Sequence, residues 1–312
     1  MTGVVDHGIW TTEDDVSRIA EAVIRALADR VLRRLTKLGE GIAHLALETD
    51  DGLVVMVGKN YMAPHDRDVS LRLLPALDGR LPLAVPRPLW AIEHADDLPF
   101  GVYAYEKLPG TSISVERTQA SVVPYAHQIG AIIAALGSFP VDKAQALGVL
   151  TPSAFGKKLI LCRREIDPAL RSLLTPREFA ALGRWWTDFE TDQVLRDSPV
   201  CLVHGDFWAA NILIDTGSQR VTGVIDFANA MLGDVANDFA TLRNNGYEFT
   251  NACIEGYVAA GGVLGPHLEH RVERYWQLRS SSLFSFQASL RLHDGTELAH
   301  ALSDLRGGPI LA

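Results

Sequence analysis

The first regular pattern in the chain is that of an amphipathic helix beginning near residue 12. Thr12 can accept hydrogen bonds from free backbone amides, and three acids follow it where the helix dipole favours negative charge. Apolar residues then recur at three- and four-residue spacing, which places them on one side of a helix. They are Val16, Ile19, Ala20, Val23 and Leu27. The pattern predicts a helix with one buried face.

The period then changes to that of β-strands. Three strands are predicted, at residues 31–38, 42–48 and 53–58. The turn Gly39-Glu40-Gly41 joins the first two, and Asp50-Asp51-Gly52 joins the next two, because an Asp-Gly step tolerates positive φ. The hairpins predict an antiparallel sheet near the start of the chain.

A short helix is expected at residues 66–77. Prolines at positions 82, 86 and 88 then exclude helix and lead into two extended segments, 90–92 and 102–106. The first 106 residues are therefore predicted to form a β-rich N-terminal domain.

Beyond the Leu108-Pro109-Gly110 step the pattern is mostly helical. Residues 122–136 predict a buried helix, and Thr175 followed by Pro176 is typical of a helix start. One hairpin, at residues 212–226, interrupts the helices. We therefore expect an α+β protein in which residues 107–312 form a larger, mainly helical C-terminal domain.

Composition narrows the class of protein. With 312 residues, 47% of them apolar and 21% charged, the chain can bury one or two cores, which excludes a disordered protein. The net charge of −9 argues against generic binding to nucleic acid or to an anionic membrane. The longest uncharged stretch, residues 118–141, contains two prolines and Gln128, so a core helix is expected there rather than a membrane span.

The cysteines and the start of the chain indicate the compartment. Cys162, Cys201 and Cys253 are odd in number and widely spaced, as expected of reduced thiols. The first residues contain neither a basic segment nor an apolar one of the kind that directs export. A cytoplasmic protein is therefore expected.

Several common site motifs are missing. No P-loop pattern occurs, and the Gly39-Glu40-Gly41 turn lacks the third glycine of a dinucleotide fingerprint, since His44 stands there. The histidine pairs His267/His270 and His293/His300 do not form H-E-x-x-H, so solvated helix histidines are expected rather than a metal site.

The residues that indicate chemistry lie between positions 201 and 242. His204-Gly205-Asp206 is followed after four residues by Asn211, and Asp226-Phe227 closes the next hairpin. A single aspartate at the end of a strand is more often a turn or cap residue. The prediction of an active site therefore rests on the occurrence of these residues together. A turn centred near residues 218 and 219 would place Asn211 opposite Asp226.

An amide oxygen and a carboxylate side by side are hard ligands of the kind that Mg²⁺ prefers. Asp206 lies in a loop before them, from which it can reach an attacking hydroxyl without binding the metal. A cation beside the phosphates and a carboxylate beside the hydroxyl are what phosphoryl transfer requires.

These residues, together with Gly233-Asp234, Asp238 and Ala240, resemble the signature of the aminoglycoside and macrolide phosphotransferases. The resemblance implies a two-lobed protein-kinase-like fold and transfer of phosphate from ATP or GTP, with Mg²⁺, to a hydroxyl of a small molecule. It implies Asp206 as the catalytic base and Asn211 and Asp226 as metal ligands. Asp238 and His204 would support the catalytic loop.

The resemblance extends to the N-terminal domain. It implies that Lys59 contacts the α- and β-phosphates, that Gly39 and Gly41 lie over the phosphates, and that Glu106 and Leu108 bind adenine through their backbone. The sequence departs from the family pattern at Ser70, where a glutamate partner of the lysine is expected. Asp66, one helical turn earlier, is the substitute that we expect.

The acceptor is expected to be an antibiotic, and charge indicates which class. Residues 1–110, 111–240 and 241–312 carry net charges of −5, −3 and −1, so the segment that walls the acceptor site in this family is nearly neutral. This segment also contains seven aromatic residues, most of them expected in the core. A macrolide is therefore favoured over a polycationic aminoglycoside. A kinase of an amino alcohol or sugar, a nucleotide-binding module without catalysis, and either a monomer or a homodimer stay open.

Overall fold

The computed structural model describes residues 13–26, 35–113 and 119–311. The chain forms two compact units, one of residues 1–110 and 222–229 and the other of residues 111–221 and 230–312. The fold class is α+β, as predicted. The first unit consists of α1 (Glu13–Ala26), β1 (Leu35–Glu40), β2 (His44–Thr49), β3 (Leu53–Gly58), α2 (Ala63–Leu77), β4 (Pro88–Ile92), β5 (Val102–Glu106) and the short 3₁₀ helix η3 (Phe227–Asn229).

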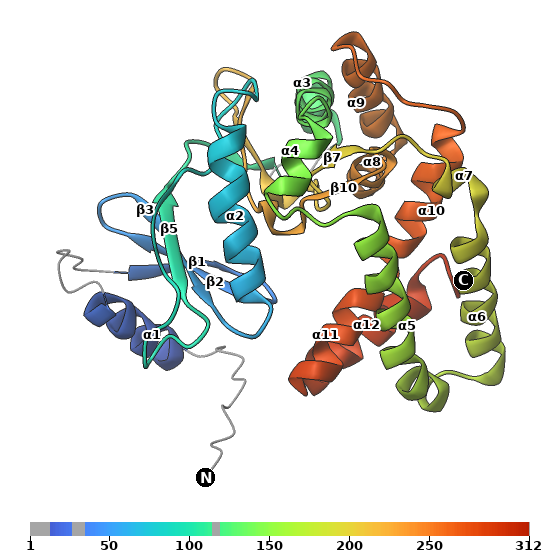
Figure 1. Cartoon of the computed structure of the whole chain (residues 1–312), viewed down its shortest axis with the longest axis horizontal. Coiled ribbons are helices and arrows are strands. Elements are labelled where there is room, and N and C mark those ends of the chain that lie inside the picture. The colour runs from blue at the N-terminus through green and yellow to red at the C-terminus, as the bar shows by residue number, and fades with distance from the viewer. Residues whose placement is uncertain (1–12, 27–34, 114–118, 312) are drawn as a thin grey trace. The chain divides into compact units, whose positions relative to one another are not determined.

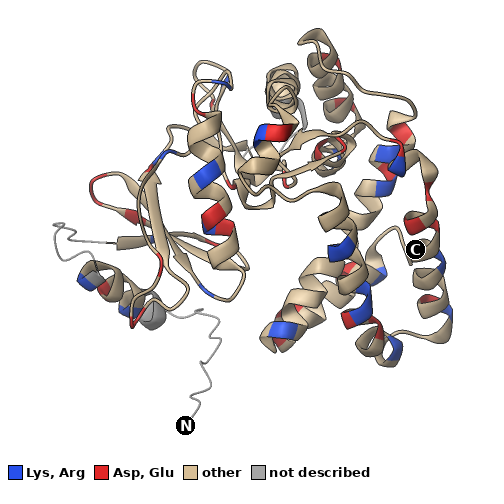
Figure 2. Cartoon of the chain, in the orientation of Figure 1, with Lys and Arg blue, Asp and Glu red and all other residues tan. Residues whose placement is uncertain are grey.

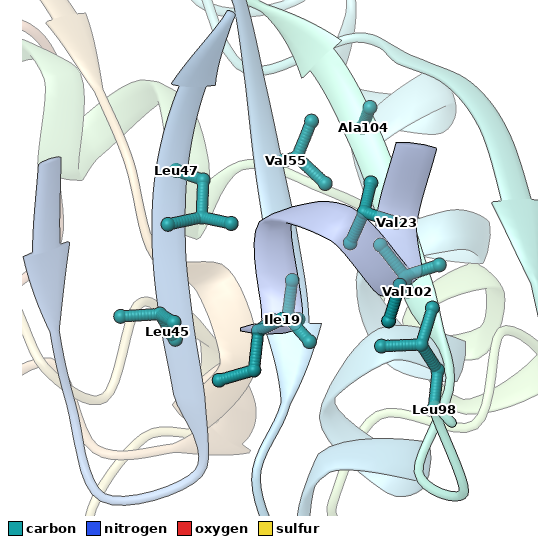
Figure 3. Packing of buried hydrophobic residues seen from close by; sticks show 10 residues of the cluster. Ile19, Val23, Leu45, Leu47, Val55, Leu98, Val102 and Ala104 are labelled. Atoms are coloured by element: carbon teal, nitrogen blue, oxygen red, sulfur yellow. The ribbon is translucent and has the colours of Figure 1, made fainter. Parts of the chain in front are cut away.

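The first unit is built on an antiparallel sheet in the order β1-β2-β3-β5-β4. Helix α1 covers one face, where Ile19 and Val23 pack on alternate residues of the strands (Figures 1 and 3). The strand residues of this cluster are Leu45, Leu47, Val55, Val57, Val102 and Ala104. The predicted apolar stripe of the helix is thus confirmed at Ile19 and Val23, whereas Thr12 and Leu27 lie outside the described residues.

The intervening strand residues point to the other face, because successive side chains of a strand alternate. A second cluster forms there from Val54, Tyr103 and Tyr105. Met56 of β3 and Leu71 of α2 pack against it. The central strand β3 is therefore apolar at every position, as a strand buried on both faces must be.

Two of the predicted boundaries are wrong. Strand β1 continues through Gly39 and Glu40, which oppose Ala46 and Leu45, so the turn falls at residues 41–43 rather than 39–41. A bulge between Lys37 and Gly39 makes this continuation possible, because it inserts one extra residue into the strand. The first four residues of the predicted strand, 31–34, lie outside the described residues. Helix α2 begins three residues earlier than predicted, at Ala63, with a proline in its first turn.

The second unit is mainly helical. Its helices are α3 (Gln119–Gly137), α4 (Val141–Ala146), α5 (Pro152–Leu173), α6 (Pro176–Thr191), α7 (Gln193–Arg196), α8 (Ala236–Leu242), α9 (Tyr247–Ala259), α10 (Leu268–Ser280), α11 (Leu283–Leu292) and α12 (Gly295–Gly307), with the 3₁₀ turns η2 (Ala209–Asn211) and η4 (Arg243–Asn245). Its strands are β6 (Thr111–Ser112), β7 (Cys201–Val203), β8 (Ile212–Asp215) and β10 (Met231–Gly233). The predicted start at Thr175 is confirmed as a capping box with Glu178.

The predicted hairpin is present as β8 and β9 (Arg220–Val224), which lie side by side in a three-stranded sheet with β6. Strand β9 carries the chain into residues 222–229 of the first unit. There Ala84 bridges Gly223, and Val224 donates to the Ala84 carbonyl at 3.3 Å. The register that would place Asn211 opposite Asp226 stays a prediction.

Across residues 13–26, 35–113 and 119–311, no helix has both the length and the apolarity that a membrane crossing requires. The longest uncharged stretch forms α3, whose side chains Tyr125, Ile129, Ile132 and Ile133 are buried in the second unit.

Helices α3 and α9, which lie side by side in Figure 1, approach each other through a glycine on each. A Cβ on Gly130 would overlap the Cys253 carbonyl oxygen and lie 2.5 Å from the Tyr257 nitrogen. A Cβ on Gly256 would lie 2.6 Å from the His127 Cα. Because these are backbone atoms, they cannot move aside as a side-chain end could.

Gly130→Ala should therefore lower the free energy of unfolding by about 2 kcal/mol or more, as overpacking in a core does. Gly156 is the matched control: it lies in α5 with nothing within 4 Å of its virtual Cβ. Gly156→Ala should raise stability by up to about 1 kcal/mol, because alanine favours helix. Denaturant unfolding of both variants checks this, and equal midpoints would contradict the close approach of α3 and α9.

Candidate functional site

The loop that follows β7 is held by one buried carboxylate. Both oxygens of Asp238, on α8, accept backbone hydrogen bonds, from His204 N and from Gly205 N, at 2.9 Å each. Gly205 has a φ of 77°, a conformation that glycine adopts without strain. Asp238 thereby fixes the backbone immediately before Asp206, in the position where a supporting residue was expected.

Asp206 and Asn211 lie together at the end of this loop. The Asn211 amide nitrogen donates to the Asp206 carbonyl oxygen at 3.0 Å and lies 3.5 Å from its carboxylate. Both partners can only accept, so the amide nitrogen faces them and the amide oxygen Oδ1 points away. That oxygen is the atom a cation would bind, which fits Asn211 as a hard ligand for Mg²⁺.

Burial and nearby polar groups shift the pKa of Asp206 in opposite directions. Burial raises the pKa of the Asp206 carboxyl, while the positive charge of Arg279 and the hydrogen bond from Asn211 lower it in part. Burial also raises the pKa of Asp238, to about 6, against its two backbone hydrogen bonds and the Arg279 charge. Arg279, on α10, donates to the Asn237 side chain at 3.0 Å. The charge of one arginine therefore acts on both carboxylates.

Further contacts fix both ends of the loop. The Ser112 hydroxyl lies 3.1 Å from the Ala209 and Ala210 carbonyls, and the Thr241 hydroxyl donates to the Phe207 carbonyl at 2.8 Å. The buried His204 ring packs edge-on against Phe207, and its Nδ1 lies 3.3 Å from the Asp206 nitrogen. These contacts attach the loop to β6 and α8, and none of them uses the Asp206 carboxylate.

Asp226 belongs to the first unit, where it follows β9 and precedes η3. Its φ of 64° is in the left-handed region, which costs energy for a residue other than glycine and is common at functional sites. Burial raises the pKa of Tyr103 well above its ordinary range; a hydrogen bond from Ser70 opposes this, and the charges of Asp226 and Asp66 add to it. The carboxylates of Asp226 and Asp66 therefore both act on the Tyr103 hydroxyl, at the face of the sheet that α2 covers.

Lys59 follows β3 and is buried. Its ammonium group forms an ion pair with Glu40 of β1 and donates to the Gly41 carbonyl at 3.0 Å. Gly39 lies within β1 and Gly41 begins the turn. The sequence predicted Asp66 as the acid partner of this lysine, whereas the ion pair in the structure is with Glu40.

The predicted adenine-binding segment leaves the end of β5. Glu106 is the last residue of the strand and opposes Leu53, and Lys107 donates to the Gly52 carbonyl at 2.9 Å. Leu108 follows in the connection to β6. The roles of Glu106 and Leu108 stay predictions.

Two residues of the site were missed by the sequence analysis. Glu40 was treated as the middle of a glycine turn, although an acid between two glycines close to the lysine hairpin was a usable signal. Arg279 carried no signal, because an arginine on an amphipathic helix cannot be distinguished from a solvated one by its sequence context. Among the described residues, no group of three or more histidines, cysteines and acids has the geometry of a metal site.

Comparisons with known proteins identify the family. The model of the phosphotransferase enzyme family matches residues 34–275, and the chain belongs to that family. It is thus an enzyme that transfers phosphate to a hydroxyl of a small molecule.

Three solved structures illustrate the likeness. The GDP and kanamycin complex of APH(2")-IIIa has a TM-score of 0.79 at 21% identity, covering 93% of this chain and 97% of that one. Macrolide 2'-phosphotransferase MphH from Brachybacterium faecium has a TM-score of 0.70 at 21% identity, covering 91% and 98%. A type I macrolide 2'-phosphotransferase has a TM-score of 0.68 at 24% identity, covering 96% and 99%. At these identities the likeness establishes the fold.

Asp238→Asn should destabilise the protein by about 1–3 kcal/mol, because an asparagine amide would turn one N–H group toward a backbone N–H and leave both unpaired. Denaturant unfolding measures this. Asp215→Asn is the control, since that aspartate caps an exposed turn through Gly217 N. Equal midpoints for the wild type and Asp238→Asn would contradict the role of Asp238 in holding the loop.

Proposed function

We propose that the protein transfers the γ-phosphate of a nucleoside triphosphate to a hydroxyl of an antibiotic, with a macrolide as the favoured acceptor. The observation that carries the proposal is the fixed loop in which Asp206 is positioned by Asp238 and lies next to the Asn211 amide. Similar folds have been solved with GDP, with ADP and with ATP, which supports a nucleotide donor.

In this proposal Asp206 accepts the proton of the acceptor hydroxyl and orients its oxygen toward the γ-phosphate. A general base is most effective when its pKa is raised toward the working pH, and burial shifts the pKa of Asp206 in that direction. His204 and Asp238 hold the backbone of the loop. Lys59 would bind the phosphates, with Gly39 and Gly41 over them and with Glu106 and Leu108 at the base.

Asn211 and Asp226 would hold Mg²⁺. The amide oxygen of Asn211 faces away from its protein partners, and the two residues supply the hard oxygen ligands that this ion prefers. When bound, Mg²⁺ would neutralise charge on the phosphates.

Asp206→Asn should lower kcat by about 10²–10⁴-fold, the usual contribution of a positioned base, while nucleotide affinity stays within a few-fold of the wild type. Steady-state turnover and nucleotide titration measure the two quantities. Asp215→Asn serves again as control, because it removes an exposed carboxylate of the adjacent strand. A kcat that survives Asp206→Asn would exclude this residue as the base.

The surface beside the catalytic loop supports a bulky, largely uncharged acceptor. Trp208, two residues after Asp206, is 45% exposed, and Tyr247 at the start of α9 is 65% exposed. The Arg243 guanidinium lies 4.3 Å from the Tyr247 ring centre and 4.6 Å from that of Trp276. The Thr241 hydroxyl connects the end of α8, just before Arg243, to Phe207 of the catalytic loop.

Two acids that belong to α10 or contact it are already paired. Glu273 forms an ion pair with Arg243, and Asp192 lies within salt-bridge distance of His270 and Arg274. Helix α10 itself carries three arginines against two glutamates (Figure 2). An apolar ring system would find exposed aromatic faces here.

An aminoglycoside is the second candidate acceptor, because the kanamycin-bound structure has the higher TM-score, 0.79 against 0.70 for the macrolide enzyme MphH. An amino alcohol or sugar acceptor would use the same catalytic residues.

A panel of macrolides, aminoglycosides and small amino alcohols, each assayed for nucleotide turnover with ATP and with GTP, distinguishes these acceptors. The expected result is macrolide-dependent turnover with kcat/KM at least tenfold above that of any aminoglycoside. Turnover with aminoglycosides alone would contradict the macrolide assignment and leave the kinase chemistry intact.

A further inference from the structure

The turn between β1 and β2 is attached to the end of β3 through three successive carbonyl groups. Lys59 donates to Gly41 O through its side chain at 3.0 Å and to Ala43 O through its backbone at 2.8 Å. The Asn60 side chain donates to Ile42 O, the carbonyl between them, at 2.7 Å. Both Lys59 and Asn60 are buried.

This attachment determines which side of the turn can receive an anion. In a trans peptide the C=O and N–H groups point in opposite directions. Since the carbonyls of Gly41 and Ile42 face Lys59 and Asn60, the N–H groups of Ile42 and Ala43 point away from them. Successive backbone N–H groups on one side of a turn form a concave site for phosphate oxygens.

Glu40 closes this arrangement from the turn side. One of its carboxylate oxygens pairs with Lys59, and the other accepts from Lys37 at 2.6 Å. Burial raises the pKa of Glu40, but the hydrogen bonds and charges of the two lysines outweigh it, so the pKa is lowered overall. The group of Lys37, Glu40 and Lys59 thus keeps one net positive charge, which attracts phosphate.

The position on α2 where the family pattern places an acid holds Ser70 instead. Ser70 is buried and forms a hydrogen bond with Tyr103, so it offers no charge to a lysine. An ammonium group has three N–H bonds, and Glu40 and Gly41 O take two of those of Lys59. One remains for a phosphate oxygen.

We propose that Glu40 is the residue that positions Lys59 for the phosphates, in place of an acid on α2. The inference rests on the proposed nucleotide donor and goes beyond it in assigning the lysine's partner to the last residue of β1, directly before the turn. Glu40 and Lys59 then act as one unit: the lysine holds the carbonyl side of the turn, and the acid at the end of β1 holds the lysine.

A different role of Glu40 would change nucleotide binding in the opposite direction. If Glu40 only occupied the place of a phosphate, removing its charge would free Lys59 and tighten nucleotide binding. If Glu40 positions Lys59, removing its charge lets the ammonium group leave its place and weakens binding.

The test compares nucleotide dissociation constants of the wild type, Glu40→Gln, Glu40→Asp and Lys59→Met, measured with a fluorescent ATP or GTP analogue in the full chain. Glu40→Gln should weaken nucleotide binding about tenfold or more, Glu40→Asp by less, and the KM for the acceptor should stay unchanged. Glu40→Gln combined with Lys59→Met should bind no more weakly than Lys59→Met alone, because the two residues act as a unit. A merely structural role of Glu40 would add to the loss instead.

Asp97→Asn is the matched control: it removes an acid of an exposed pair, that with Arg25, in the same unit. Glu40→Gln binding as tightly as the wild type or more tightly, or a loss in Asp66→Asn without one in Glu40→Gln, overturns the inference while nucleotide binding stands. A Lys59→Met variant that binds as well as the wild type overturns the role of Lys59 at the phosphates and the inference with it. A wild-type chain that binds no nucleotide overturns the proposed donor itself.

Discussion

The arrangement of the loop around Asp206 depends on a buried carboxylate that accepts two backbone N–H groups. Asp238 binds His204 N and Gly205 N at equal distances, and neither group reaches water in this position. A carboxylate is suited to this because it presents two acceptor oxygens and no donor. Because these two amides are fixed, the backbone of the next residue, Asp206, is held in place. The Asn211 side chain can then donate a hydrogen bond to the Asp206 carbonyl oxygen. The loop is therefore positioned by an element, α8, that follows it in the chain.

Burying acids in this way needs compensation, and the molecule supplies it with few cations. Arg279 acts on both Asp206 and Asp238, and Arg271 pairs with the buried Asp234. Both arginines come from α10, so this helix carries the positive charges that act on the acids in and around the loop. In the first unit one acid is likewise shared, since Glu40 forms ion pairs with both Lys37 and Lys59. In each unit, one charged side chain thus acts on two of opposite charge: Arg279 on Asp206 and Asp238, and Glu40 on Lys37 and Lys59.

Much of this could be predicted from the sequence, for identifiable reasons. The β8–β9 hairpin and the start of α6 were predictable because they depend on local turn and cap chemistry, and the match of Asp238 to its supporting position came with the motif. The end of β1 was not predictable, because a bulge near Lys37 depends on pairing with β2. Nor was the partner of Lys59: helix geometry favoured Asp66, whereas the fold of the sheet brings Glu40 to the lysine. Contacts between segments far apart in sequence, such as that of Arg279 with Asn237, leave no periodic trace.

The central claim is that the loop around Asp206 transfers a nucleotide's terminal phosphate to a small-molecule hydroxyl. The most direct measurement incubates the protein with Mg²⁺, a nucleoside triphosphate carrying an isotopic label in the γ-phosphate, and a mixture of macrolides, aminoglycosides and small amino alcohols. Mass spectrometry then locates the label. The account predicts that the label appears as a phosphate ester on one macrolide hydroxyl. Label that stays on the nucleotide, or is released only as inorganic phosphate with every acceptor class supplied, would contradict it.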